Sequence, residues 1–268
     1  MKSEPIVKVS STVDSEGALV VCCFPSVSMV SSIVAHYLIE RLDLTFCGGV
    51  RHPRLPAVCL VQDGAPMPPI RFYAGQPVCT LDSCDKLIVI VSEVQIHGML
   101  ALPLTEALLE WSKEANTGAG ILVDSFSHGA EDLHELVDDD DTDETILGIG
   151  STEENREQLD SMGIPLLKHG VVGGMTGVLL GEGRRRGLNM MAIMAEAAAE
   201  YPDARAAARV IDHLDLLLPA IKLDTEPLIE EAERIEEQIK ALMMHNLQAS
   251  EEDLDPTLSE SSSSMIYG

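Results

Sequence analysis

Residues 18–24 read ALVVCCF, and after a four-residue break, residues 29–42 read MVSSIVAHYLIERL. The first stretch is a continuous apolar run, which is typical of a strand covered on both faces of its sheet. The second stretch carries apolar side chains every three or four residues, so it predicts a helix with one buried face. A buried strand followed directly by a helix begins a βα unit and favours an α/β fold.

The alternation of strand-like and helix-like segments continues through the first two-thirds of the chain. Apolar runs predict further strands at residues 57–61, 70–73, 86–92, 120–124 and 145–150. Helical patterns follow at residues 105–116 (with Thr105 as N-cap), 155–162 and 203–218. Parallel neighbours need a crossover connection, which a helix supplies. We therefore predict an α/β fold with a mixed, mostly parallel sheet flanked by helices.

A glycine-rich segment, GVVGGMTG at residues 170–177, precedes an apolar run that we interpret as a strand at residues 178–180. Residues 188–194 are predicted to form a buried strand, and the alanine-rich residues 195–200 a helix. The chain's only basic cluster, at residues 184–186, follows the glycines. Glycines near arginines can cradle a phosphate, but the spacing is neither GxxxxGK[ST] nor GxGxxG. Glycines that permit tight turns and close packing are the simpler interpretation.

The charge balance limits the classes of partner. The 268 residues include 44 acidic and 18 basic side chains, for a formal net charge of −26. Nucleic acid and anionic membrane surfaces are therefore unfavourable partners. The apolar runs are far shorter than the roughly 20 residues that span a bilayer, and no secretory signal is visible. We expect a cytoplasmic protein that binds neither nucleic acid nor membrane.

Cysteines and histidines do not suggest a metal centre. Six cysteines occur without a CxxC pair or a zinc-type histidine spacing. Cys22, Cys23 and Cys59 lie in apolar runs, where free thiols are expected to be buried. We expect no metal and no cofactor.

Catalytic patterns are also missing. Ser125 and His128 are close in sequence but lack the flanking glycines of a GxSxG elbow. His128, Asp132, His134, Glu135 and the aspartates from Asp138 fit no metal-ligand spacing, and their charge density indicates a solvated loop. We expect no catalytic residue and no enzymatic activity.

The C-terminal part of the chain differs in composition from the rest. Leu228, Ala232, Ile235, Ile239 and Leu242 step by four and three residues, which predicts a coiled-coil-like amphipathic helix. Its narrow apolar seam needs either the parent domain or another protomer to cover it. Beyond residue 248 the chain is acidic and serine-rich, which is typical of a flexible tail. The expected organisation is a domain at 1–222, a helix at 223–248 and a tail at 249–268. Candidate oligomer contacts are Leu228, Ile235, Ile239 and Leu242.

The last three residues, Ile266, Tyr267 and Gly268, match the HbYX pattern of proteasome-binding proteins: a hydrophobic residue, a tyrosine and any residue with a free carboxylate. A slot between neighbouring ring subunits can accept the aliphatic and aromatic side chains. A lysine there can pair with the terminal carboxylate. The pattern indicates a proteasome-binding tail.

Residues 154–244 resemble the archaeal proteasome-assembly chaperone family. The resemblance is carried by residues 170–180 and 188–196, by Pro202-Asp203 and by the helix that begins at Leu228. It implies a fold like that of purine nucleoside phosphorylases, and a homo-oligomer whose C-terminal tails bind the 20S proteasome core or its α subunits. The alternative that the fold leaves open is a phosphorylase-like enzyme that binds a nucleoside or phosphate.

Overall fold

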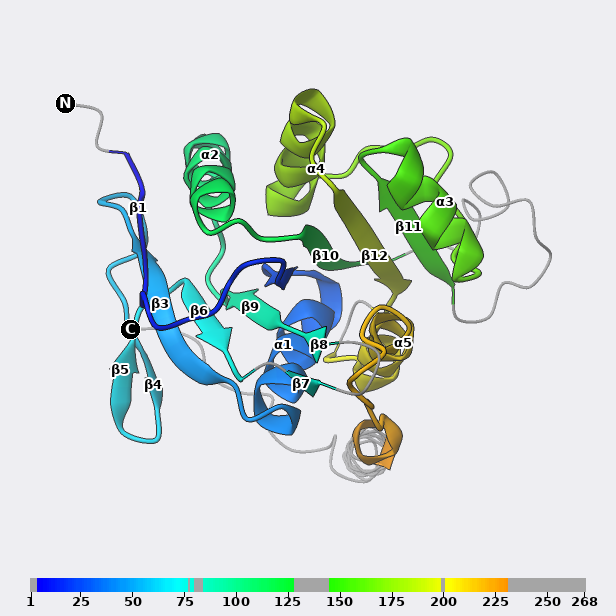
Figure 1. The fold of residues 1–268 in the computed structure, drawn as a ribbon, viewed down its shortest axis with the longest axis horizontal. Helices are drawn as coiled ribbons and strands as arrows, with labels where there is room; N and C mark the ends of the chain where they lie inside the picture. The colour runs from blue at the N-terminus through cyan, green and yellow to red at the C-terminus, as the bar shows by residue number, and fades with distance from the viewer. Residues whose placement is uncertain (1–3, 77, 80–83, 128–144, 199–200, 231–268) are drawn as a thin grey trace, which may run out of the picture. The chain divides into compact units, whose positions relative to one another are not determined.

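The computed structural model describes residues 4–76, 78–79, 84–127, 145–198 and 201–230 (Figure 1). The chain divides into two compact units, Met1–Thr225 and Glu226–Gly268. The first unit holds all the strands described below. Of the second unit, residues 226–230 are described, and they are helical.

An eight-stranded mixed sheet forms the centre of the first unit. Its strand order is β1-β3-β6-β9-β2-β10-β12-β11. The strands are β1 (Ile6–Val9), β2 (Leu19–Cys23), β3 (Thr45–Arg51), β6 (Arg71–Ala74), β9 (Leu87–Val91), β10 (Ala119–Phe126), β11 (Ile146–Gly150) and β12 (Met190–Glu196). Two short hairpins accompany the sheet: β4 (Leu60–Gln62) with β5 (Ala65–Met67), and β7 (Val78–Cys79) with β8 (Cys84–Asp85).

Helices cover both faces of this sheet (Figure 1). They are the short η1 (Val27–Met29), α1 (Val30–Arg41), α2 (Gly98–Glu114), α3 (Glu153–Ser161), α4 (Gly174–Arg186) and α5 (Ala204–Asp215). Helices α2 and α4 pack together on one face, while α1 and α5 pack together on the other. Alternate residues of β2 therefore face different pairs of helices. Val20 and Cys22 face α2 and α4, since they belong to the core cluster that includes Leu104 of α2 and Leu179 of α4.

The central segments confirm the α/β interpretation. The predicted strand at 18–24 and helix at 29–42 correspond to β2 and α1, and the predicted strands at 86–92 and 120–124 correspond to β9 and β10. Every residue of β9 is buried, because helices lie over both faces of the strand. Helix α5 also follows its prediction, with the Asp203 carboxylate accepting the Ala206 backbone N–H at 2.8 Å.

The expected predominance of parallel pairing is wrong. Only the three pairings among β9, β2, β10 and β12 are parallel, whereas the four outer pairings of the large sheet are antiparallel. Among the described residues, the connections from β3 to β6 and from β6 to β9 contain short hairpin strands and no helix. Such connections suit antiparallel neighbours, since parallel pairing needs a crossover.

Several predicted element boundaries are also wrong. Residues 178–180 lie in α4, whose buried positions recur at helical spacing rather than in alternation. Ala195 extends β12 instead of starting a helix, because pairing with β10 and β11 outweighs the helix propensity of alanine. Helix α2 starts seven residues before Thr105, which is a buried residue inside the helix. Of residues 57–61, only the last two belong to a strand, β4.

The prediction that three cysteines are buried is confirmed at two of the three positions. Cys22 and Cys23 are buried free thiols, but Cys59 is exposed because its run does not enter the large sheet. Burial raises the pKa of Cys22 to about 12, so this thiol stays neutral.

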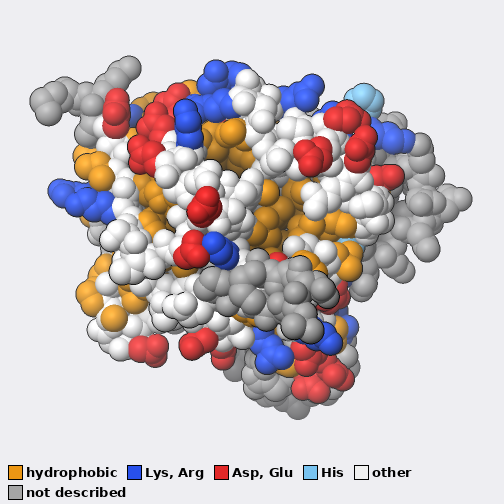
Figure 2. Space-filling model, viewed as in Figure 1, with side chains coloured by type: hydrophobic (Ala, Val, Ile, Leu, Met, Phe, Trp, Pro, Cys, Tyr) orange, Lys and Arg blue, Asp and Glu red, His pale blue; other side chains and the backbone are white. Residues whose placement is uncertain are grey.

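Surface character varies over the face seen in Figure 2. Charged side chains of both signs gather along the top of the view, and apolar side chains reach the surface nearer its centre. No helix in the described part of the chain is long and apolar enough to cross a bilayer.

Candidate functional site

The carboxyl ends of the parallel strands are where open α/β sheets usually place ligands, at points where the helices after neighbouring strands lie on opposite faces. Strands β9 and β2 are such neighbours. Strand β2 leads into α1 on one face, and β9 leads toward α2 on the other (Figure 1). The structure places a polar cluster beside the end of β9.

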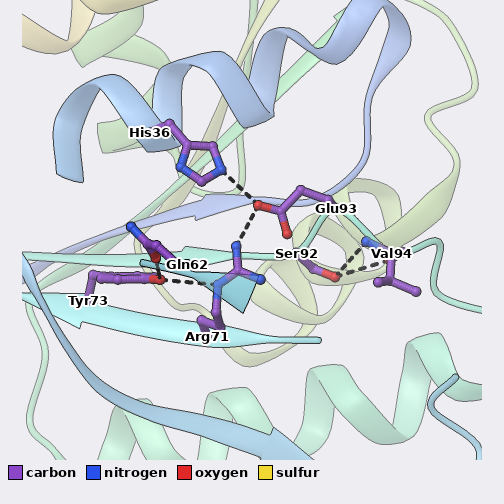
Figure 3. Close-up of polar contacts among 7 residues, drawn as sticks. All are labelled: His36, Gln62, Arg71, Tyr73, Ser92, Glu93 and Val94. Atoms are coloured by element: carbon purple, nitrogen blue, oxygen red, sulfur yellow. Dashed lines mark hydrogen bonds and ion pairs between the residues drawn. The ribbon is translucent and has the colours of Figure 1, made fainter. Parts of the chain in front are cut away.

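This polar cluster consists of His36, Gln62, Arg71, Tyr73 and Glu93 (Figure 3). Glu93 lies two residues beyond β9, and its Oε1 accepts hydrogen bonds from Arg71 Nη2 at 2.5 Å and from His36 Nε2 at 2.8 Å. Arg71 Nε also lies 3.2 Å from the Tyr73 hydroxyl, which donates to Gln62 Oε1 at 2.8 Å. The cluster thereby connects α1, β6, the β4–β5 hairpin and the end of β9.

Charge is deeply buried in this cluster. The Arg71 side chain is 3% exposed, whereas that of Glu93 is 21% exposed. Burial alone would raise the pKa of Glu93, but the hydrogen bonds from His36 and Arg71 and the charge of Arg71 lower it to about 2. Burial likewise opposes the charge of Arg71, yet the pairing with Glu93 raises the pKa of Arg71. Both groups therefore remain charged at neutral pH.

Glu93 and Arg71 are poorly suited to moving protons at neutral pH. A general acid or base works best with a pKa near the operating pH, and Glu93 and Arg71 are both far from it. Arg71 Nη1 and Glu93 Oε2 are buried without a hydrogen-bond partner among the described residues, so one donor and one acceptor remain for water.

The glycine-rich segment meets a carboxylate at the start of α4. Gly173 is the N-cap of this helix, and the hydroxyl of Thr176 in its first turn hydrogen-bonds the Asp124 carboxylate. Burial raises the pKa of Asp124, while hydrogen bonds from Thr176 and from the Ser125 backbone N–H oppose the rise. A carboxylate thus lies where an anionic phosphate would otherwise interact with the helix dipole.

The three arginines lie at the other end of α4, in its last turn. At 1.5 Å per residue, Gly174 and Arg186 are about 18 Å apart along the helix. Arg185 and Arg186 pair with Glu182, at 2.6 and 3.0 Å, and Arg184 Nη1 donates to the Ser151 carbonyl at 3.1 Å. The structure therefore does not bring the glycines and arginines together as a phosphate site.

The other residues singled out from the sequence fall partly outside the described structure. Among the residues it describes, no group of three or more His, Cys, Asp and Glu side chains is placed to hold a metal ion. The Ser125 hydroxyl donates to the Val27 carbonyl at 2.6 Å, and its predicted neighbour His128 lies outside the described residues. The same is true of Asp132, His134, Glu135 and the aspartates from Asp138.

Most of the residues proposed for docking and for oligomer contacts also lie outside the described residues. Leu228 lies in the helical residues 226–230. The others lie outside the described residues: Ile235, Ile239, Leu242, Ile266, Tyr267 and Gly268. Their roles remain predictions.

Sequence reasoning missed the polar cluster. Its one signal is Arg71, a charge inside the apolar segment IRFY at residues 70–73. A buried arginine needs a carboxylate partner, but the chain offers 44 acidic residues, and only the fold selects Glu93.

These features define an α/β protein in which a buried arginine, Arg71, pairs with Glu93 beside the carboxyl end of β9. Residues 20–243 match the PAC2 family, so the chain belongs to that family. An uncharacterized protein of Methanocaldococcus jannaschii is 27% identical over 235 residues, covering 88% of this chain and 89% of that protein.

Two solved structures are similar to this chain over most of its length. PbaA of Pyrococcus furiosus, described as an archaeal homolog of proteasome-assembly chaperone, is 28% identical, with a TM-score of 0.78 over 96% of this chain and all of PbaA. PbaB of the same organism, described as an archaeal proteasome activator, shares the fold at 19% identity, with a TM-score of 0.74 over 91% of this chain and all of PbaB.

Proposed function

We propose that this protein is a non-enzymatic, cytoplasmic chaperone of proteasome assembly, or a related proteasome-binding factor. The observation that carries the proposal is the likeness to PbaA over nearly the whole of both chains. Membership of the PAC2 family supports it. The resemblance further implies the purine nucleoside phosphorylase-like arrangement of sheet and helices.

The C-terminal tripeptide is the proposed contact with the 20S core or its α subunits. Ile266 fills an apolar slot between neighbouring α subunits, and Tyr267 packs beside it. The carboxylate of Gly268 pairs with a lysine of the ring, a charge-assisted contact that only a free chain end can make. A ring lysine is also a favourable partner for a chain of net charge −26.

Several tails act together in this proposal. The apolar seam of Leu228, Ile235, Ile239 and Leu242 joins protomers into a homo-oligomer. Residues 248–264 form a spacer of about 17 residues, whose mean span is on the order of 20–25 Å if flexible. Such a reach suits neighbouring pockets on a ring.

Two tail variants test the docking. Tyr267→Ala removes the aromatic contact, and one extra residue after Gly268 displaces the carboxylate. We expect either change to prevent co-purification with the 20S core or its α subunits. Met265→Ala, just outside the tripeptide, is the matched control and should co-purify normally. Unchanged pull-down by both tail variants would show that the tail does not dock.

A further inference from the structure

A cleft of about 270 Å³ lies between α2 and α4. It is near the amino ends of the parallel strands, whereas the polar cluster lies beside the carboxyl end of β9. Its floor is formed near the amino ends of β2, β10 and β12, by Val20, Gly120 and Met190 among others. Leu108 of α2 and Leu179 of α4 form its walls. The interior is therefore largely apolar.

Gly120 leaves open space on the floor of the cleft. It sits in β10, on the same side as the buried Leu122 and between the neighbouring residues Val20 and Met190. A Cβ at this position would meet only Met190 within 4 Å, at 3.4 Å or more. The missing side chain thus leaves space in a central strand whose neighbours are close-packed.

The mouth of the cleft is polar and carries a positive charge. Lys113, Ser112, Thr117 and Asn189 line it. The Lys113 side chain is exposed and makes no hydrogen bond or ion pair with any described residue. Lysine is scarce in this chain of net charge −26, so a free ammonium beside an apolar opening is a distinctive feature.

We propose that this cleft binds a small amphipathic carboxylate, such as a medium-chain fatty acid. The apolar body lies over Gly120, between Leu108 and Leu179, and the carboxylate pairs with Lys113 at the mouth. A dry cavity of 150 Å³ can hold one benzene ring, so about 270 Å³ has room for roughly twice that apolar volume. It is too small for a helix or a protein domain.

This site is independent of the proposed tail docking, and its test does not use the proteasome. The chain's only tryptophan, Trp111, lines the cleft, so its fluorescence reports occupancy directly. The probes are hexanoate, octanoate and decanoate, titrated into the full-length protein, with decanol as the uncharged comparison.

Affinity should rise about fourfold with each added methylene until the cleft is filled, and then level off. Decanoate should bind about two- to fivefold more tightly than decanol, the range of an exposed ion pair. Absence of a Trp111 response to all three acids, or equal affinity for decanol and decanoate, would overturn the proposal.

Variants locate the binding. Gly120→Val fills the floor and should abolish the response to decanoate, while Gly120→Ala, whose Cβ meets Met190 at ordinary contact distance, should weaken it partially. If Gly120→Val does not fold, the surface change Lys113→Gln still tests the site. It should weaken decanoate about two- to fivefold and leave decanol unchanged.

The matched control is Lys8→Gln, which removes a charge from the exposed Lys8 on edge strand β1. It should leave both affinities unchanged. Equal weakening of decanoate by Lys8→Gln and Lys113→Gln would mean that net charge, and not this cleft, governs the response, and would overturn the assignment.

Discussion

Arg71 begins strand β6 with a charged side chain that is 3% exposed. An unpaired charge in such a place costs several kcal/mol, because the guanidinium loses its hydration. Glu93 and the Tyr73 hydroxyl replace part of that hydration. The charge is accommodated there because Tyr73 of the same strand and Glu93, from beyond the end of β9, both reach it.

Replacing Glu93 should therefore destabilise the protein strongly. Glu93→Gln leaves Arg71 charged and uncompensated, and we expect the free energy of unfolding to fall by about 3 kcal/mol. Urea denaturation measures the change. His36→Gln removes a partner whose side chain is 50% exposed and should cost less than about 1 kcal/mol.

A second variant separates charge from packing. In an Arg71→Met background, Glu93→Gln should cost much less, since no buried charge remains to be compensated. Equal cost in both backgrounds would mean that Glu93 acts through its shape and not through its charge.

The same pair makes stability depend on pH. Because the folded-state pKa of Glu93 is lowered from 4.5 to about 2, its contribution is present above pH 4.5 and is lost as the pH falls toward 2. Other carboxylates titrate in the same range. The measurement is therefore the difference in unfolding free energy between wild type and Glu93→Gln, which should shrink from pH 7 to pH 2.5. A difference that stays constant would contradict the assigned pairing.

At the scale of elements, sequence patterns predicted the parts that are buried on both faces or amphipathic. β2, β9 and α1 have continuous or periodic apolar residues, and both patterns follow directly from burial. The helix predicted to begin at the N-cap Thr105 instead begins at Gly98, because α2 keeps Pro103 in its second turn and gives up one backbone hydrogen bond there. Propensity alone could not show that packing on α4 compensates for it.

The sequence did not predict the edge of the sheet or the polar cluster, because both depend on contacts between residues that are far apart in the chain. Strand β3 contains Gly48, where a Cβ would overlap the backbone of Lys8 in β1. The glycine that permits this approach also weakens the strand signal. The polar cluster draws on residues 36, 62, 71, 73 and 93, which only the folded topology brings together. The tail motif is a contiguous sequence pattern, so it can be proposed from the sequence alone, and its role stays a prediction.

Two glycines of α4 should respond oppositely to alanine. A Cβ at Gly177 would overlap the carbonyl oxygen of Val172, which is backbone and cannot move aside. Gly177→Ala should therefore destabilise the protein by about 1–3 kcal/mol. Gly181, in the same helix, has nothing within 4 Å of its Cβ position, so Gly181→Ala should stabilise by about 0.5–1 kcal/mol. Urea denaturation distinguishes the two signs. Stabilisation by both would show that the turn before α4 is not closely packed.

At the scale of the whole molecule, the proposed assembly rests on the apolar seam. Ile235→Asp with Ile239→Asp would place two charges in a narrow apolar contact, so the oligomer should dissociate. Light scattering should then give the monomer mass of 28.9 kDa, while wild type gives a larger mass. Glu236→Ala, off the predicted seam, is the control and should keep the wild-type mass. A wild type that is itself monomeric would exclude several tails on one particle.

The double aspartate variant also separates the affinity of one tail from the avidity of several. It keeps Ile266, Tyr267 and Gly268 intact, so each tail retains its own contacts with the ring. Linked tails raise overall affinity by about 10²–10⁴ over a single tail, without new contacts. The monomeric variant should therefore bind the 20S core about 10²–10⁴ times more weakly than wild type, as measured by surface plasmon resonance. Adding Tyr267→Ala should remove the remaining binding. If the monomeric variant binds as tightly as wild type, one tail is sufficient and the seam serves the fold alone.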